Sequence, residues 1–303
     1  MPATARSPSP SVSIIGVGRL GTALAIALNE AGYRIEALLT RRHRRPKRSI
    51  AGLDAQPHVL VTENVGELGA SRLVIIATPD DQIELVVQKL SRLRVAKSET
   101  KIVLHTSGAL SSEVLKPLAA RGWSIGSIHP LIAVSEPEAG AIALHTAFWC
   151  VEGDRRATRL ARKIVRDLGG RTFSIRADDK PLYHAAAVMA SGNLVALFDV
   201  AIEMLGKCGV TRREARRILL PLADSAIRNL GLADPAQALT GTFARGDVAT
   251  VRRHVEALAG KSPGAPLELY RLLGSRSADL ATKAGLDQTT VMQIRKVLNN
   301  SHR

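Results

Sequence analysis

The most informative shortages in this sequence are those of aromatic residues and cysteine. Aromatic residues make up 3% of the chain and hydrophobic residues 46%, so any core must consist mainly of aliphatic side chains. The two cysteines, Cys150 and Cys208, form neither a C-x-x-C motif nor a metal-binding spacing. This argues against a disulfide scaffold and against a zinc site. We therefore expect a reduced, cytoplasmic protein without a bound metal.

Acidic residues are also scarce, because 27 Asp and Glu stand against 42 Lys and Arg and leave a formal net charge of +15. Such an excess attracts anions in general and carries no information about the fold. The densest basic run is "TRRHRRPKR" at 40–48, in which six residues are Lys or Arg. Neither interleaved aromatic residues nor a known binding module accompanies it, so binding of nucleic acid is not favoured.

Two segments could be mistaken for a signal peptide or a membrane span. Residues 1–10 are rich in Pro and Ser and lack an apolar centre, so they predict a disordered leader rather than a signal peptide. The most apolar stretch, at 185–202, contains Gly192, Asn193 and Asp199 and lies among other amphipathic segments. It therefore predicts a buried helix better than a membrane span.

Short apolar runs alternate with helical periods from residue 11 to about residue 176, and only helical patterns follow. The runs that predict strands are "SVSIIGV", "RIEALLT", "LVIIATP", "KIVLHTS", "SIGSIHP" and "AFWCVEG". This alternation predicts an α/β domain over 11–176, with a Rossmann-type, doubly wound and mostly parallel sheet. Residues 177–303 are expected to form a separate, all-helical domain.

A glycine-rich turn follows the first expected strand and precedes a helix. Gly16, Gly18 and Gly21 form a G-x-G-x-x-G motif in the context that a dinucleotide-binding turn requires. The first glycine would permit the tight turn, the second the approach of a pyrophosphate, and the third close packing of the helix. Arg19 and Leu20 lie inside the motif and are expected to contact the same cofactor. An ordinary tight turn is the alternative.

The tip of the second strand bears on which nicotinamide coenzyme is bound. About 20 residues after the motif, an NAD-binding protein carries an acid for the ribose hydroxyl. This chain instead has Thr40, Arg41 and Arg42. An acid would repel a ribose 2′-phosphate, whereas a hydroxyl group and a planar guanidinium would bind it. The sequence therefore predicts NADP, held at these three residues.

Polar residues occur where three further strands are expected to end, at the edge where doubly wound sheets bind ligands. Thr78 and Pro79 are expected to line the nicotinamide side of the cofactor. The candidates for substrate binding are His105, Ser107, Gly108 and His129. Each alone could be a cap or a packed loop residue, but their convergence from separate segments favours a functional role.

The first helix expected after residue 177 carries the candidate catalytic pair. Lys180 and His184 are four residues apart and therefore share one face of a helix. A lysine near a helix N-terminus opposes the macrodipole, which would lower its pKa and suit it to donate a proton to a reduced carbonyl or imine. The alternatives are a surface lysine beside two aspartates and a histidine packed in the core.

Several motifs occur along the chain in an order seen in one group of bacterial proteins. They are the glycine turn, "ATPDD", "HTSGALSSEVL", "SIHPL", "KPLYHAAAVMASGN" and "LTGTFARGD". The chain therefore resembles proteins with a Rossmann-like domain followed by a helical domain of unknown function 2520. That group looks like a relative of pyrroline-5-carboxylate reductase, 6-phosphogluconate dehydrogenase and the β-hydroxyacid dehydrogenases. The relationship implies an NADP-binding fold and a helical substrate domain that forms dimers.

The resemblance also concerns individual site residues. The β-hydroxyacid dehydrogenases carry a catalytic Lys followed four residues later by Asn, whereas Lys180 is followed at that spacing by His184. In "LTGTFARGD", Arg245 would bind a substrate anion, from its own chain or from a partner subunit. A turn between helices with an Arg–Asp pair is the alternative.

Two functional classes remain open at this point. We expect an NADP-dependent oxidoreductase that acts on a small, anionic carbonyl, imine or alcohol at the crevice between the domains. The alternative is a non-catalytic NADP-binding sensor or regulatory protein, because a fold alone does not separate the two. We also expect a homodimer through the helical domain, and no membrane as a partner.

Overall fold

The computed structural model describes residues 10–41, 53, 57–61, 68, 71–93 and 100–300. They belong to two compact units, one from Met1 to Ser191 and one from Gly192 to Arg303. The sequence pattern changes near residue 176, but the helix that follows this change belongs to the first unit. Lys180 and His184 therefore lie in the same unit as the sheet.

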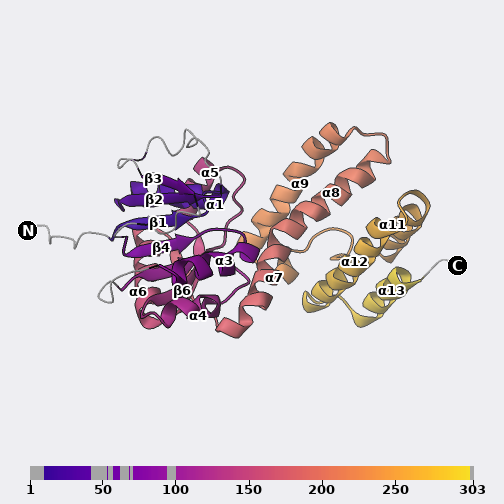
Figure 1. Ribbon diagram of the computed structural model, residues 1–303. Coiled ribbons are helices and arrows are strands. Elements are labelled where there is room, and N and C mark those ends of the chain that lie inside the picture. Colours follow the sequence, from indigo (N-terminus) through magenta and orange to yellow (C-terminus); the bar gives the residue numbers. More distant parts are fainter. Residues whose placement is uncertain are drawn as a thin grey trace, which may run out of the picture. The chain divides into compact units, whose positions relative to one another are not determined.

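The first unit contains an eight-stranded sheet in the order β3-β2-β1-β4-β5-β6-β7-β8 (Figure 1). Neighbouring strands are parallel, except that β6 and β7 run antiparallel. The strands are β1 (Val12–Ile15), β2 (Ile35–Thr40), β3 (His58–Val61), β4 (Leu73–Ile76), β5 (Ile102–His105), β6 (Ser124–Pro130), β7 (Phe148–Gly153) and β8 (Arg171–Phe173). The strand order turns back beside β1, which confirms the doubly wound, mostly parallel sheet and places its switch point between β1 and β4.

Helices cover both faces of this sheet, so its central strands β1, β4 and β5 are buried along their whole length. On β1, Ile14 belongs to a buried cluster with Leu28 and Ile164, whereas Ile15 belongs to a second cluster with Val87. Burial of each aliphatic side chain of this kind stabilises the folded state by about 1.5–3 kcal/mol. The helices of the first unit are α1 (Arg19–Glu30), α3 (Asp80–Ser91), α4 (Lys116–Ala119), α5 (Pro137–Leu144), α6 (Arg155–Asp167) and α7 (Lys180–Ala190).

The described residues of the second unit form helices and their connecting turns without any strand, as the sequence pattern predicts. Its helices are α8 (Gly192–Gly206), α9 (Arg212–Leu232), α10 (Pro235–Ala238), α11 (Val248–Lys261), α12 (Ala265–Lys283) and α13 (Gln288–Asn299). Val251, Ala278 and Ile294 are buried in its core, which forms where α11, α12 and α13 pack together. The helices α8 and α9 contact each other.

The apolar stretch at 185–202 differs from the expectation. It is divided between α7 and α8, and most of its side chains are exposed; Val195, for example, is 71% exposed. The prediction of a buried helix is therefore wrong for the single chain. Among the described residues, Ala177–Gly206 is also the one segment long and apolar enough to span a membrane by length and composition, with a mean hydropathy of 1.8. The same segment contains Lys180, which is fully buried in the first unit.

Candidate functional site

The glycine turn has the geometry that its sequence predicts. Gly16 has a φ of 100°, and a Cβ atom there would lie 2.7 Å from the backbone of Ala77 at the end of β4. A Cβ atom on Gly21 would lie 1.9 Å from the carbonyl oxygen of Gly16, so α1 packs directly on the turn. Gly18 caps α1 and has open space where its side chain would be. The turn thus leaves room at one glycine and none at the other two.

The end of β2 lies beside this turn, because the N–H of Gly16 donates to the carbonyl oxygen of Leu39 at 2.9 Å. Thr40 is the last residue of β2 and is half-buried, and Arg41 follows it with an exposed side chain. The geometry brings the predicted phosphate-binding residues Thr40 and Arg41 next to the glycine turn. Arg42 and the rest of the basic run lie outside the described residues.

The N-terminal end of α1 suits an anion. No acidic residue lies in its first turn, and no side chain accepts a hydrogen bond at its N-cap. Arg19 is the exposed first residue of the helix, and Leu20 is half-buried against the core of the sheet. Unpaired backbone N–H groups and the helix dipole favour a phosphate at such a position.

Thr78 and Pro79 follow β4 at the same edge of the sheet. The Oγ1 atom of Thr78 is buried and has no hydrogen-bond partner among the described residues. Pro79 is exposed and caps α3. A buried hydroxyl group without a partner is rare in native proteins and often marks the place of a ligand or water. The residues present therefore fit a dinucleotide at this edge.

Lys180 is the most unusual residue of the site, because its side chain is 0% exposed. Its Nζ atom donates to the backbone carbonyl oxygen of Ser107 at 2.9 Å and to the hydroxyl oxygen of Ser127 at 2.6 Å. Burial lowers the pKa of Lys180, while Cys150 and Glu152 oppose this effect. The predicted lysine thus lies between the carboxyl end of β5 and the middle of β6, with its ammonium group enclosed.

His105 is the last residue of β5 and is fully buried. Its Nδ1 atom accepts a hydrogen bond from the N–H of Ser107 at 3.2 Å. Burial, followed by the charge of Lys180, lowers the pKa of His105 to about 3, although the backbone of Ser111 weakly favours the proton. Its Nε2 atom is buried and has no hydrogen-bond partner within the described part of the chain. His105 is therefore a neutral imidazole that supports the loop after β5.

His129 lies near the end of β6 and is partly exposed. Its Nδ1 atom is 2.6 Å from the phenolic oxygen of Tyr183, and the two rings meet edge to face. Burial, then Lys180, then His184 lower the pKa of His129 to about 4. Burial also raises the pKa of Tyr183. At neutral pH both partners of this hydrogen bond are therefore uncharged.

Gly108 brings the two partly exposed histidines together. A Cβ atom on Gly108 would lie 2.3 Å from Nδ1 of His184 and 2.8 Å from Cε1 of His129. The two imidazole rings have centroids 5.6 Å apart and are nearly perpendicular. The Nδ1 atom of His184 is buried and has no partner in the described structure. The absence of a side chain at Gly108 is what lets both rings close over the loop that follows β5.

The hydroxyl group of Ser107 is already engaged within the protein. It donates to a carboxylate oxygen of Asp80 at 2.8 Å and accepts from the N–H groups of Ala109 and Leu110. Two described carboxylates thus lie close to the lysine, and both have partners. The second is Glu152, which accepts from the N–H and hydroxyl groups of Ser112, both at 2.7 Å. These bonds hold the loop after β5 against α3 and β7.

Arg245 lies in the second unit, in the turn before α11, and its side chain is exposed. Asp247, two residues later, accepts a hydrogen bond from the N–H of Thr250 and caps that helix. The role of Arg245 in substrate binding stays a prediction.

Sequence reasoning missed three members of the site. Tyr183, Ser127 and Cys150 all lie close to the predicted residues, and Cys150 is paired with His129 across β6 and β7. Tyr183 could have been found, because it lies one helical turn after Lys180 in the same motif. Ser127 and Cys150 carry no comparable signal, because each lies inside an apolar strand. Among the described residues, no cluster of three or more His, Cys, Asp or Glu could hold a metal ion.

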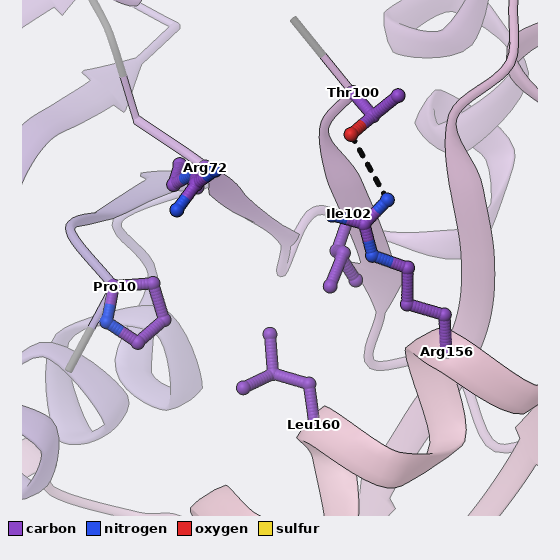
Figure 2. A pocket seen from close by; sticks show the side chains of 6 residues that line it. All are labelled: Pro10, Arg72, Thr100, Ile102, Arg156 and Leu160. Atoms are coloured by element: carbon purple, nitrogen blue, oxygen red, sulfur yellow. Dashed lines mark hydrogen bonds between the residues drawn. The ribbon is translucent and has the colours of Figure 1, made fainter. Parts of the chain in front are cut away.

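A separate hollow of about 240 Å³ lies at the opposite edge of the sheet, at the amino ends of β4 and β5 (Figure 2). It combines apolar side chains with Arg72 and Arg156, and Arg156 donates to the hydroxyl oxygen of Thr100 at 2.9 Å. Ligands of doubly wound sheets bind at the carboxyl ends of strands, so this hollow is distinct from the candidate site.

Comparisons with known proteins agree with this two-part organisation. A family model described as a Rossmann-like domain matches residues 2–130, and one described as a domain of unknown function (DUF2520) matches residues 147–277. Glycerol-3-phosphate dehydrogenase (NAD(P)+) from Orientia tsutsugamushi (strain Boryong) is 26% identical over 141 residues. That match spans 42% of this chain and 40% of the relative.

Solved structures match nearly the whole chain. A candidate NADP oxidoreductase from Bacteroides fragilis is 21% identical, with a TM-score of 0.70 over 90% of this chain and 99% of that chain. A protein from Thermotoga maritima is 23% identical, with a TM-score of 0.64 over 96% and 100%. An imine reductase from Aspergillus terreus, in complex with NADPH4, is 18% identical, with a TM-score of 0.60 over 94% and 99%. At these identities the likeness shows the fold alone.

Proposed function

This chain joins a Rossmann-like domain to a domain of unknown function 2520, and from that premise we propose that it is an NADP-dependent oxidoreductase. Its substrate is a small, anionic carbonyl, imine or alcohol. The observation that carries the proposal is a fully buried lysine beside uncharged histidines, at the sheet edge that also holds the glycine turn. Buried ionisable groups with strongly shifted pKa values gather at functional sites.

NADP is the coenzyme in this proposal. Gly18 and the N-terminus of α1 would hold the pyrophosphate, Thr40 and Arg41 would hold the ribose 2′-phosphate, and Thr78 would line the nicotinamide side. The absence of an acid after β2 supports NADP over NAD, because a carboxylate would repel the extra phosphate. When bound, the coenzyme exchanges hydride with the substrate, and the protein supplies orientation and electrostatics.

The described contacts favour His184 over Lys180 as the group that exchanges a proton with the substrate. The ammonium group of Lys180 is enclosed and makes two hydrogen bonds, so it has no exposed surface to offer. His184 is partly exposed and lies one turn further along α7. Lys180 instead places a positive charge near the site, which would attract an anionic substrate.

The other candidates have supporting roles in this proposal. His129 and Gly108 border the substrate position, whereas His105 and the Ser107 hydroxyl group support the loop through internal bonds. Arg245 would bind the anionic group of the substrate from the second unit, or from a partner subunit. A basic side chain in this role is consistent with the net charge of +15.

A second copy of the chain is the partner that we propose for the helical unit. Large apolar side chains are exposed on α8 and α9, including Val195 at 71% and Leu222 at 69%. Apolar surface of this extent on adjacent helices is typical of a protein–protein interface. A homodimer would cover these residues without any additional partner.

The test is turnover of NADPH by the full chain. We expect oxidation of NADPH, followed at 340 nm, with at least one member of a panel of small keto acids, cyclic imines and aldehydes that carry a carboxylate. Tight NADPH binding with no turnover across the panel would instead favour a sensor. Equal binding of NADPH and NADH would remove the basis for the coenzyme assignment.

A further inference from the structure

We propose that Tyr183 fixes the tautomer of His129, so that His129 offers an Nε2–H donor to the oxygen or nitrogen of the substrate's carbonyl or imine group. Lys180 is the positioning residue of this arrangement. The inference rests on the proposed function for the identity of the substrate group. Its central claim, the tautomer of one histidine, is a property of the protein itself.

The direction of the hydrogen bond between Tyr183 and His129 follows from the groups around it. Tyr183 also contacts the thiol of Cys150, and burial raises the pKa of that thiol, so it carries its proton. Sulfur is a weak acceptor, whereas a neutral imidazole nitrogen is a good one. The phenolic proton therefore goes to Nδ1 of His129, at an oxygen–nitrogen distance of 2.6 Å. The remaining proton of the neutral ring is then on Nε2.

The surroundings keep the imidazole of His129 neutral. The charged and titratable groups near His129 and the adjoining Lys180 come from α7, β5, β7 and α3: Lys180, Tyr183, His184, His105, Cys150, Glu152 and Asp80. Both carboxylates are bound to serines, and no described carboxylate pairs with His129. Burial and the charge of Lys180 lower the pKa of His129 to about 4. A neutral imidazole that donates from one nitrogen can polarise a carbonyl group across the physiological pH range.

The position of the donor is fixed by contacts among α7, the loop after β5, and β6. Lys180 ties the first turn of α7 to the carbonyl oxygen of Ser107 and to Ser127, and thereby sets where Tyr183 lies. Gly108 lets the Nε2 edge of His129 pass within 2.9 Å of the position that a Cβ atom would occupy. The ring of His184 lies beside that of His129, and its Nδ1 atom has no hydrogen-bond partner among the described residues. That atom is therefore available to a bound substrate where the two rings meet.

The first experiment measures the tautomer directly in the full chain, by long-range ¹H–¹⁵N correlation spectra of ¹⁵N-histidine-labelled protein. Comparison with a His129→Asn variant assigns the signal. We expect a neutral ring with its proton on Nε2 at pH 7, and a mixture of tautomers in Tyr183→Phe. A wild-type ring with its proton on Nδ1, or a charged ring at pH 7, would overturn the inference.

A matched control exists in the second unit, where Nδ1 of His254 lies 2.8 Å from the phenolic oxygen of Tyr270. Tyr270→Phe removes the same kind of bond and is expected to leave the His129 signal and turnover unchanged. In Lys180→Met we expect the pKa of His129 to rise above about 4 but to stay below 6.5, because burial is the larger cause. An unchanged pKa in a folded Lys180→Met protein would contradict the role given to the lysine.

Turnover provides the last arm of the test. Tyr183→Phe is expected to lower kcat by about tenfold and His129→Asn by about a hundredfold, with little change in the Kd for NADPH, because a positioned donor acts mainly in the transition state. Wild-type protein with the expected tautomer but no NADPH oxidation would refute the proposed function alone. An active enzyme in which His129→Asn has normal kcat would refute this inference alone.

Discussion

The Nζ atom of Lys180 lies 2.9 Å from the backbone carbonyl oxygen of Ser107, although the two residues are 73 positions apart. This contact attaches the start of α7 to the loop after β5. It explains why the helix belongs to the sheet unit, while the sequence pattern suggests a boundary near residue 176. A buried charge is costly unless it is well hydrogen-bonded, and here two oxygens meet that requirement.

Gly108→Ala is expected to reduce turnover strongly while the protein remains folded. The new methyl group would lie 2.3 Å from Nδ1 of His184, so at least one imidazole must move. We expect kcat/KM to fall by about tenfold or more, because small displacements of positioned groups are costly. Steady-state kinetics and NADPH titration would measure this.

The matched control is Gly260→Ala in α11, where a methyl group meets nothing within 4 Å. It should leave turnover unchanged and raise stability by a few tenths of a kcal/mol to about 1 kcal/mol, because Ala favours a helix over Gly. Equal kinetics of the two variants would argue against a role for the paired histidines.

Arg41→Ala is expected to remove the preference for NADPH over NADH. The preference itself should be about tenfold or more, equivalent to one charge-assisted contact of roughly 1.5–3 kcal/mol. Fluorescence titration with both coenzymes would show whether Kd for NADPH rises while Kd for NADH stays constant. Arg34→Ala, at the exposed amino end of the same strand, removes an equal charge and should change neither value.

Acid should destabilise the protein in a specific pH window. The pKa values of His105 and His129 are lowered to about 3 and about 4, whereas in the unfolded chain they lie near 6.5. Between pH 6.5 and the lowered pKa values, the unfolded state therefore binds more protons than the folded state. The free energy of unfolding falls as the pH decreases through this range. The slope is about 1.4 kcal/mol per pH unit for each group.

Urea unfolding at several pH values between 7 and 5 would measure that slope. Either His105→Asn or His129→Asn should remove the contribution of one histidine from the slope. His58→Asn, at an exposed position of β3, should leave the slope unchanged. A wild-type free energy of unfolding that is constant over this range would show that both imidazoles bind protons equally in the folded and unfolded states.

The apolar surface of α8 and α9 predicts a homodimer in solution. Light scattering after gel filtration should give twice the 32.4 kDa mass of one chain. Leu222→Asp should shift the mass toward that of one chain, because it would bury a carboxylate in the interface. Ile142→Asp is a control, since this residue is 74% exposed on α5 in the other unit. Dissociation by both variants would indicate a different interface.

The sequence determined much of the fold, because short-range patterns carry it. Apolar runs fixed the central strands, and the spacing of three glycines fixed the first turn, whose geometry depends on backbone conformation and close packing. The same patterns missed β3, β8 and α5. The two strands lie at the edges of the sheet and are only partly buried, so they lack a continuous apolar run. The helix α5 is Ala-rich, has eight residues and lacks a strong amphipathic period.

The sequence by itself determined which residues gather at one edge of the sheet, because motifs that follow parallel strands meet at the same edge. Only the tertiary structure decided how those residues are used. It buried Lys180, engaged the Ser107 hydroxyl group with Asp80, and paired His129 with Tyr183. The physical reason is that hydrogen-bond partners and burial depend on contacts between distant segments. Those contacts also set the pKa values of the buried groups. Local sequence patterns do not reveal contacts between distant segments.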